Sequence, residues 1–184
     1  MENNENLIQF DSNISTDNDE TRIAFFANIG FFIEVAQMLE FNLRKLICYH
    51  RSVTEIEATE LTAENVQRIC QKYDAYYFKT YEDKYTLGRL KGELDNCGFL
   101  KQEIVDFFDE INEYRIMIVH KIFQNNIITD GLKEADAVNK YTQKRLIPMT
   151  NKTIEINRMV INIMNEYKTD LRSYKKQVNI TVEE

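Results

Sequence analysis

The chain has 184 residues, of which 43% are hydrophobic and 29% charged, a composition typical of one globular domain with a substantial core. Five glycines and one proline are too few for the many turns of an all-β fold, so the composition favours long helices. Most of the net charge of −7 comes from the amino-terminal segment, and the nearly neutral remainder offers no broad basic face for general nucleic-acid binding.

The first segment, residues 1–20, is rich in Asn, Asp, Glu and Ser, and it contains six acidic residues and no basic one. It has too little apolar surface to offset the entropy of ordering, so we predict an acidic disordered tail. It also lacks the basic start and apolar stretch of a secretory signal, and we expect a cytoplasmic protein with reduced thiols. Polar residues interrupt the apolar stretch at residues 23–39, which therefore predicts a buried helix and no membrane span.

The first predicted helix covers about residues 21–50. Apolar residues recur in it at alternating intervals of four and three positions, which predicts one continuous apolar stripe. These residues are Phe25, Ile29, Phe32, Ala36, Leu39, Leu43 and Leu46. His50 lies at the predicted carboxyl end of the helix, where a cation complements the helix dipole, and we interpret it as structural.

The second predicted helix covers about residues 62–79, with Thr62 in the N-cap position. Tyrosines and lysines cluster near its end and before the next helix: Tyr76, Tyr77, Tyr81, Tyr85, Lys79 and Lys84. Such residues can bind single-stranded nucleic acid by stacking, but an aromatic core and rim is the more frequent explanation.

A short third helix is predicted at about residues 86–96, and Gly98 is the residue expected to end it. Gly88 and Gly92 lie one turn apart in this helix. They either permit the close approach of another helix or are simply tolerated there.

The fourth predicted helix, at about residues 101–125, contains Arg115 and His120, separated by four apolar residues. An unpaired charge or imidazole is costly to bury in a helical bundle, so a fold that retains both usually has a use for them. Five positions correspond to about 140° of rotation on a regular α-helix, so the two residues do not share one stripe.

Arginine and histidine together supply the chemistry for metal-free cleavage of RNA, in which the 2′-hydroxyl attacks. Arg115 is a permanent planar cation suited to phosphate oxygens, and His120 titrates near neutrality and can move protons. The alternative is a structural arginine and a hydrogen-bonded imidazole. The histidines and cysteines do not have the spacing of a metal site, and we expect no metal and no cofactor.

The last third of the chain is predicted to form one long helix or two in line. Pro148 is expected to break or kink it, because proline lacks the amide donor and clashes with the preceding turn. Residues 21–180 are therefore predicted to form a single all-α domain. It would be a bundle of four to six helices with long amino-terminal and carboxyl-terminal helices.

The segment Thr86-Leu-Gly-Arg-Leu90, the short helix and the later Arg115-Ile-Met-Ile-Val-His120 resemble the HEPN superfamily, whose signature is an arginine, four to six residues and a histidine. The recognisable pattern covers residues 86–125. The resemblance implies a HEPN-like bundle and a homodimer in which Arg115 stabilises phosphate and His120 transfers protons during metal-independent cleavage of RNA. The apolar helix around this pair also leads us to predict a dimer interface there.

The same resemblance implies a toxin or antiviral-defence effector, acting on RNA and associated with a cognate antitoxin or another partner protein. Asn112, Glu113 and Lys121 flank the Arg–His pair and are candidate substrate-binding residues, although simple solvation would also explain the first two. Position 116 is Ile, where active members usually carry Asn, Asp or His. The alternative is therefore a catalytically inactive HEPN-like dimeric binding or regulatory module.

Overall fold

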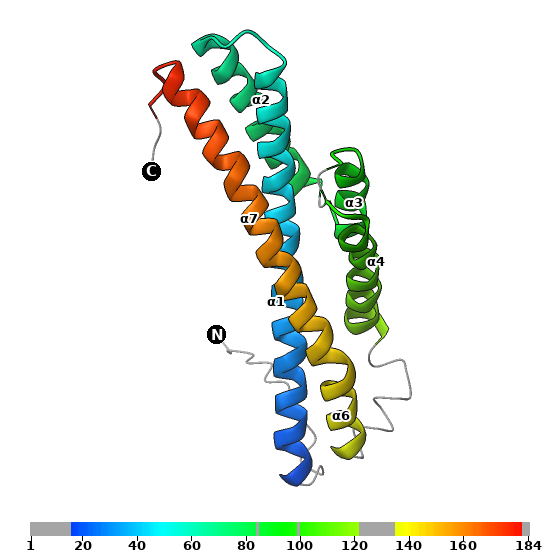
Figure 1. The fold of residues 1–184 in the computed structure, drawn as a ribbon. Coiled ribbons are helices and arrows are strands. Elements are labelled where there is room, and N and C mark those ends of the chain that lie inside the picture. Colours follow the sequence, from blue (N-terminus) through cyan, green and yellow to red (C-terminus); the bar gives the residue numbers. More distant parts are fainter. Residues whose placement is uncertain (1–15, 84, 99, 122–134, 182–184) are drawn as a thin grey trace, which may run out of the picture.

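The structure is a computed structural model and describes residues 16–83, 85–98, 100–121 and 135–181. Every regular element in these residues is helical (Figure 1). In chain order they are α1 (Thr16–Glu57), α2 (Ala63–Glu82), α3 (Leu87–Asp95), α4 (Gln102–Ile116), η1 (Met117–Lys121), α6 (Ala135–Tyr141), η3 (Thr142–Leu146) and α7 (Ile147–Gln177), where η marks π-helical turns. The predicted all-α bundle with long first and last helices is confirmed.

The two longest helices, α1 and α7, cross the whole bundle and run parallel to each other (Figure 1). Asn42 donates to Asn157 at 2.8 Å, and the Tyr174 hydroxyl donates to Glu57 at 3.0 Å, so later positions on α1 meet later positions on α7. Helix α2 returns antiparallel along the carboxyl-terminal half of α1. Helices α3 and α4 form a pair on one side of α1 (Figure 1).

Helix α1 contributes to two cores. All seven residues of the stripe predicted for it are buried in the larger core, with residues of α3, α4 and α7. The smaller core lies where α1, α2 and α7 meet, and its buried residues are Val53, Ile56, Val66, Ile69 and Leu171. The hydrophobic stripe therefore places α1 at the centre of the fold.

Helix α1 is longer than predicted at both ends. Residues 16–20, which the sequence placed in the tail, form its first turns. The rest of the predicted tail lies outside the described residues. His50 lies inside α1 and not at its end, which corrects the prediction. Its ring packs edge-on against Tyr167 with centroids 5.0 Å apart, and burial lowers the pKa of the imidazole.

Two predicted helix ends are confirmed by hydrogen bonds. The Thr62 hydroxyl accepts from the Asn65 N–H at 3.2 Å and caps α2. Gly98, after the end of α3, has a φ of 69°, which glycine adopts without a Cβ clash, and its N–H donates to the Leu94 carbonyl at 3.4 Å.

Pro148 does not break the last helix. It lies in the first turn of α7, and α6, η3 and α7 follow one another without a gap. Proline removes one backbone donor and crowds the carbonyl four residues earlier, and a wider π-helical turn just before it gives that ring room. The irregularity predicted at Pro148 is thus present as a change in hydrogen bonding within a continuous helical segment.

Part of α1, residues Ile23–Glu57, is long and apolar enough to cross a membrane by length and composition alone. Core helices of soluble proteins pass the same test. Four large hydrophobic residues of α1 are nevertheless exposed: Ile23, Phe31, Met38 and Phe41.

Candidate functional site

Arg115 lies in the last turn of α4, and its guanidinium forms an ion pair with Glu40 of α1. The same Glu40 oxygen accepts a hydrogen bond from the N–H of Leu87, the first residue of α3, at 2.9 Å. The preceding residue, Thr86, makes no side-chain cap, so Glu40 supplies the acceptor and the negative charge at this helix terminus. Glu40 is nearly buried and thereby connects three helices beside Arg115.

Two further arginines contact the residues just before α3. Arg44 of α1 donates to the Tyr85 carbonyl, and Arg89 of α3 donates to the Tyr85 hydroxyl at 2.6 Å while its guanidinium lies 3.5 Å from the ring centroid. Within the described part of the chain, neither arginine has a carboxylate at ion-pair distance. Arg44 and Arg89 thus hold Tyr85, two residues before Leu87, while Arg115 and Leu87 share the Glu40 carboxylate.

His120 lies in the π-helical turn η1, which directly follows α4. Its side chain and that of Lys121 are outside the described residues. A π-helical turn has hydrogen bonds between positions five apart, so the rotation per residue is smaller than in an α-helix. The angle between positions 115 and 120 around the helix axis is consequently smaller than the predicted 140°. The prediction of a regular α-helix over residues 101–125 is therefore wrong from Met117 to Lys121, where the helix is of the π type.

The other candidate residues lie on different sides of α4. Asn112 is half-buried against α3, and its amide nitrogen lies 3.7 Å from the place that a Cβ on Gly88 would occupy. A Cβ at position 88 would make only an ordinary van der Waals contact there, so the packing of α3 against α4 does not require this glycine. Glu113 is exposed to solvent, and Ile116 exposes 42% of its surface although it is apolar.

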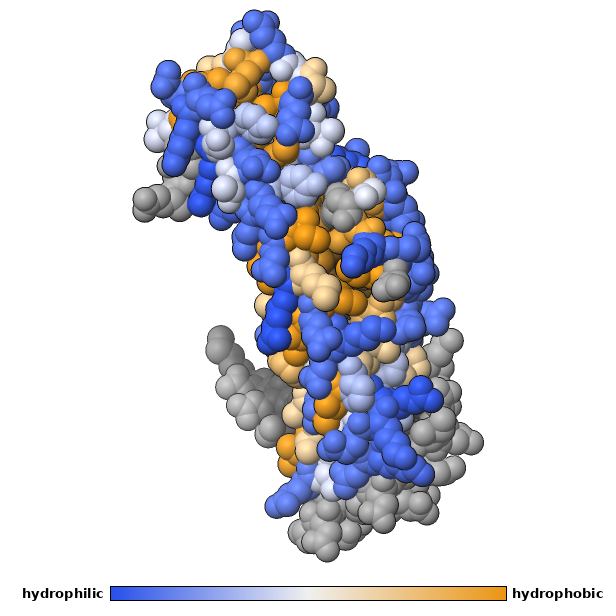
Figure 2. Space-filling view, in the orientation of Figure 1, coloured by the Kyte–Doolittle hydropathy of each residue, from blue (hydrophilic) through white to orange (hydrophobic). Residues whose placement is uncertain are grey.

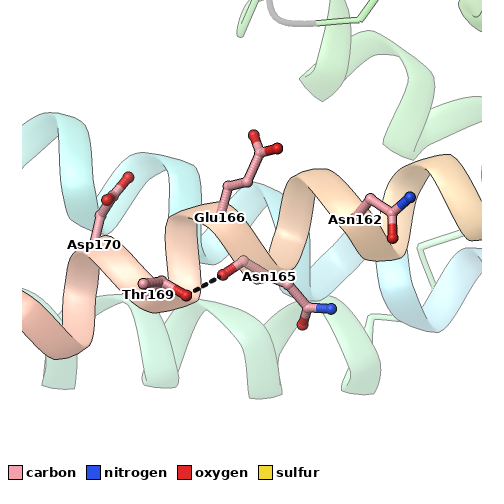
Figure 3. A pocket seen from close by; sticks show the side chains of 5 residues that line it. All are labelled: Asn162, Asn165, Glu166, Thr169 and Asp170. Carbon is pink, nitrogen blue, oxygen red and sulfur yellow. Dashed lines mark hydrogen bonds between the residues drawn. The ribbon is translucent and has the colours of Figure 1, made fainter.

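Two surface hollows lie away from Arg115. One follows a single face of α7 and is lined only by polar residues: Asn162, Asn165, Glu166, Thr169 and Asp170 (Figure 3). The Thr169 hydroxyl donates to the Asn165 carbonyl at 2.8 Å (Figure 3). Another lies at the junction of α3 and α4.

The thiols and the possible metal ligands do not form a second centre in the described residues. Cys48, Cys70 and Cys97 are free, and burial raises the pKa of the Cys48 thiol to about 12. A thiol with so high a pKa is protonated and unreactive near neutrality. No group of three or more His, Cys, Asp or Glu side chains close enough to hold a metal ion occurs in this part of the chain.

The sequence analysis missed Glu40, Arg44 and Arg89 as members of the site. A signal was available for two of them: Glu40 is a carboxylate beside the apolar stripe of α1, and Arg44 follows it by one helical turn. Their joint contact with the start of α3 required the fold. Comparisons of the chain with models of protein families, with curated proteins and with solved structures found no match.

Proposed function

We propose that the chain is a metal-independent endoribonuclease of the HEPN type, acting as a toxin or a defence effector in the cytoplasm. The observation that carries the proposal is the placement of Arg115: Glu40 fixes its guanidinium, and two further arginines, Arg44 and Arg89, hold Tyr85 just before the helix that Glu40 also binds. Such a site suits the phosphodiester group of RNA, because guanidinium groups bind phosphate oxygens through paired hydrogen bonds.

In the proposed reaction the 2′-hydroxyl attacks the adjacent phosphorus and the 5′-oxygen departs. The products are a 2′,3′-cyclic phosphate and a 5′-hydroxyl. His120 transfers the proton that leaves the 2′-hydroxyl or the one that the departing oxygen requires. Arg115 stabilises the negative charge that grows on the phosphate. Its guanidinium has five N–H donors, so the bond to Glu40 leaves others for the substrate.

Glu40 is a positioning residue in this proposal, because it contacts Arg115 and not the RNA. The carboxylate is held by the Leu87 N–H, so the guanidinium is oriented before substrate binds. Such preorganisation lowers the cost of ordering the site during the reaction. Asn112, Glu113 and Lys121 remain candidate substrate-binding residues on the same helical segment.

The test is cleavage of single-stranded RNA by the purified chain in the presence of EDTA. We expect the wild type to cut and His120→Ala to abolish cleavage. His50→Phe is the matched control, since it removes the other histidine of the chain and keeps a ring against Tyr167. Arg115→Lys should reduce cleavage strongly, because lysine cannot bind Glu40 and phosphate through a planar fork. A wild type that leaves every RNA intact, in vitro and on expression, contradicts the nuclease.

A catalytically inactive HEPN-like module that binds or regulates a partner is the second candidate. Two observations favour it: Glu40 gives Arg115 a structural contact, and an exposed Ile116 stands where active HEPN members usually carry a polar residue. Ile116→Asn separates the two candidates, because it restores the usual pattern at a position where solvent exposure makes the change tolerable. New cleavage by this variant would identify a dormant site.

We also propose that the chain is a homodimer with RNA or a cognate protein as its partner. The sequence prediction placed the dimer interface on the Arg–His helix. Ile116 and Val119 expose 42% and 50% of their surfaces there, so this helix is one exposed apolar surface of the chain, and another lies on α1.

A further inference from the structure

The exposed side of α1 has a second regular pattern besides the core stripe. Eight positions recur at alternating intervals of four and three residues, the spacing of helices that pack along another helix. We call these residues the α1 seam: Glu20, Ala24, Ala27, Phe31, Glu34, Met38, Phe41 and Lys45. The first seven are exposed and Lys45 is half-buried. Phe31, Met38 and Phe41 expose 49%, 48% and 41% of their surfaces.

The α1 seam is complementary to itself in an antiparallel arrangement. The midpoint of the seam lies between positions 32 and 33. Each residue before the midpoint has a counterpart the same number of residues after it, and the two face each other when a second copy lies antiparallel. Ala24 then faces Phe41 of a second copy, and Ala27 faces Met38. In both layers a small residue meets a large one, which is how two helix surfaces interdigitate without voids.

The charges of the α1 seam follow the same symmetry. Glu20 and Lys45 are its two ends, about 37 Å apart along the helix, and antiparallel pairing places each beside the opposite charge of the second copy. The Lys45 side chain already lies along the seam in the single chain, because its ammonium is 4.3 Å from the centroid of the Phe41 ring. Glu34 faces Phe31, and its long side chain can reach water at the edge of the pair.

The apolar surface extends from the α1 seam onto the end of α2. Tyr77 packs edge-on against Phe41 with centroids 6.3 Å apart, and the neighbouring Phe78 and Tyr81 expose 62% and 64% of their surfaces. Figure 2 shows hydrophobic side chains reaching the surface between hydrophilic ones on the face that it draws. Six of the ten large hydrophobic residues exposed in the described part of the chain lie on the seam, beside it at Ile23, or at this end of α2. Such a concentration is typical of an interface.

We propose that the chain forms an antiparallel homodimer through the α1 seam. The self-complementary order of small, large and charged residues favours a second copy over a different partner. A lipid surface fits less well, because Glu34 interrupts the middle of the seam and charging a bilayer interior is costly. The seam lies on the side of α1 roughly opposite Glu40, so this interface takes the place of the one predicted on the Arg–His helix, and each Arg115 site would lie within one chain.

The first test measures the association of the full chain by sedimentation equilibrium. We expect a dimer at micromolar concentration. Phe31→Asp and Met38→Asp should each raise the dissociation constant by roughly a hundredfold, because they place a charge in an apolar contact. Both side chains are about half exposed in the single chain, so these variants should fold. Val119→Asp, at a comparably exposed residue of η1, is the matched control and should leave the dissociation constant unchanged.

A charge exchange tests the antiparallel order. Glu20→Lys and Lys45→Glu should each raise the dissociation constant by about three- to tenfold, since each creates two like-charge contacts. The double variant restores both pairs and should return the dissociation constant to the wild-type value. Glu34→Leu should tighten the dimer.

Four results would overturn the proposal. The first is a wild type that is monomeric at micromolar concentration, and the second is a dimer that Val119→Asp abolishes and Phe31→Asp retains. The third is a double charge variant whose dissociation constant is no lower than those of the single variants. The fourth is a monomer that co-sediments with phosphatidylcholine vesicles. None of these measurements depends on RNA cleavage, so the proposed nuclease and the proposed interface are tested separately.

Discussion

Replacing Arg115 with alanine would leave the Glu40 carboxylate nearly buried without its cation. The side chains of Arg115 and Glu40 are 27% and 9% exposed, so the Glu40 carboxylate has little contact with water to replace the lost ion pair. Removing one partner of a fully buried pair costs about 3–5 kcal/mol. The Leu87 N–H would remain as a donor to Glu40, and water can enter where Arg115 is exposed, so we expect about 2–3 kcal/mol. A chain of this length should then lose about 4–12 °C in Tm.

The measurement is urea unfolding followed by far-UV circular dichroism, with the free energy of unfolding extrapolated to water. Glu40→Gln keeps an acceptor for the Leu87 N–H and should cost only about 1 kcal/mol. Combining Glu40→Gln with Arg115→Ala leaves no buried charge, so the double variant should lose less than the sum of the single losses. Arg158→Ala, at an exposed arginine of α7, is the control and should change the free energy by less than about 0.5 kcal/mol.

An Arg115→Ala variant as stable as the wild type would refute this reasoning. So would strictly additive losses in the double variant, since they would show that the two side chains do not interact. The result also decides how nuclease assays are interpreted, because a destabilised Arg115→Ala variant could lose activity through unfolding. Arg115→Lys and His120→Ala are then the informative variants.

Gly98→Ala should lower the free energy of unfolding by about 1 kcal/mol, because alanine is strained at a φ of 69°. Gly92→Ala should raise it by about 0.5–1 kcal/mol, because position 92 lies inside α3 and has open space for a Cβ. Urea unfolding measures both changes. Cys48, with its pKa raised to about 12, should react with a thiol reagent at pH 8 far more slowly in the folded chain than after unfolding, and equal rates would contradict its burial. Burial also raises the pKa of Tyr76 to about 12, above the unfolded value of about 10, so its contribution to stability is complete below pH 10 and is lost as the pH rises towards 12. Unfolding measured across that range should therefore show a steeper loss for the wild type than for Tyr76→Phe.

The helices were predictable because their signal is local. Phe25 to Leu46 follow the period of an α-helix, and all seven predicted residues are buried. The ends of α1 were not predictable in the same way, since its last turns are stabilised by α2 and α7 packing on Val53 and Ile56. That contact depends on tertiary structure and leaves only a weak trace in the periodicity.

The candidate site was only partly predictable for a related reason. Arg115 was found from its apolar surroundings, but its partner Glu40 is 75 positions away in the sequence, and no local pattern connects them. The π-helical turn η1 contains neither glycine nor proline, so no residue in it predicted the irregularity. At Pro148 the disturbance was predicted from the residue, but whether the helix would break there or continue through a π-helical turn was decided by packing.

The course of α1 through both cores has a consequence for unfolding. The smaller core holds too few buried side chains to be stable alone, and its position depends on α1 and α7. From Phe31 to Glu57 the helix contains no glycine or proline at which it would readily interrupt. Heat or denaturant that melts one core must therefore disturb the helix that supports the other, and the two ends of the molecule should lose their structure in a single cooperative transition.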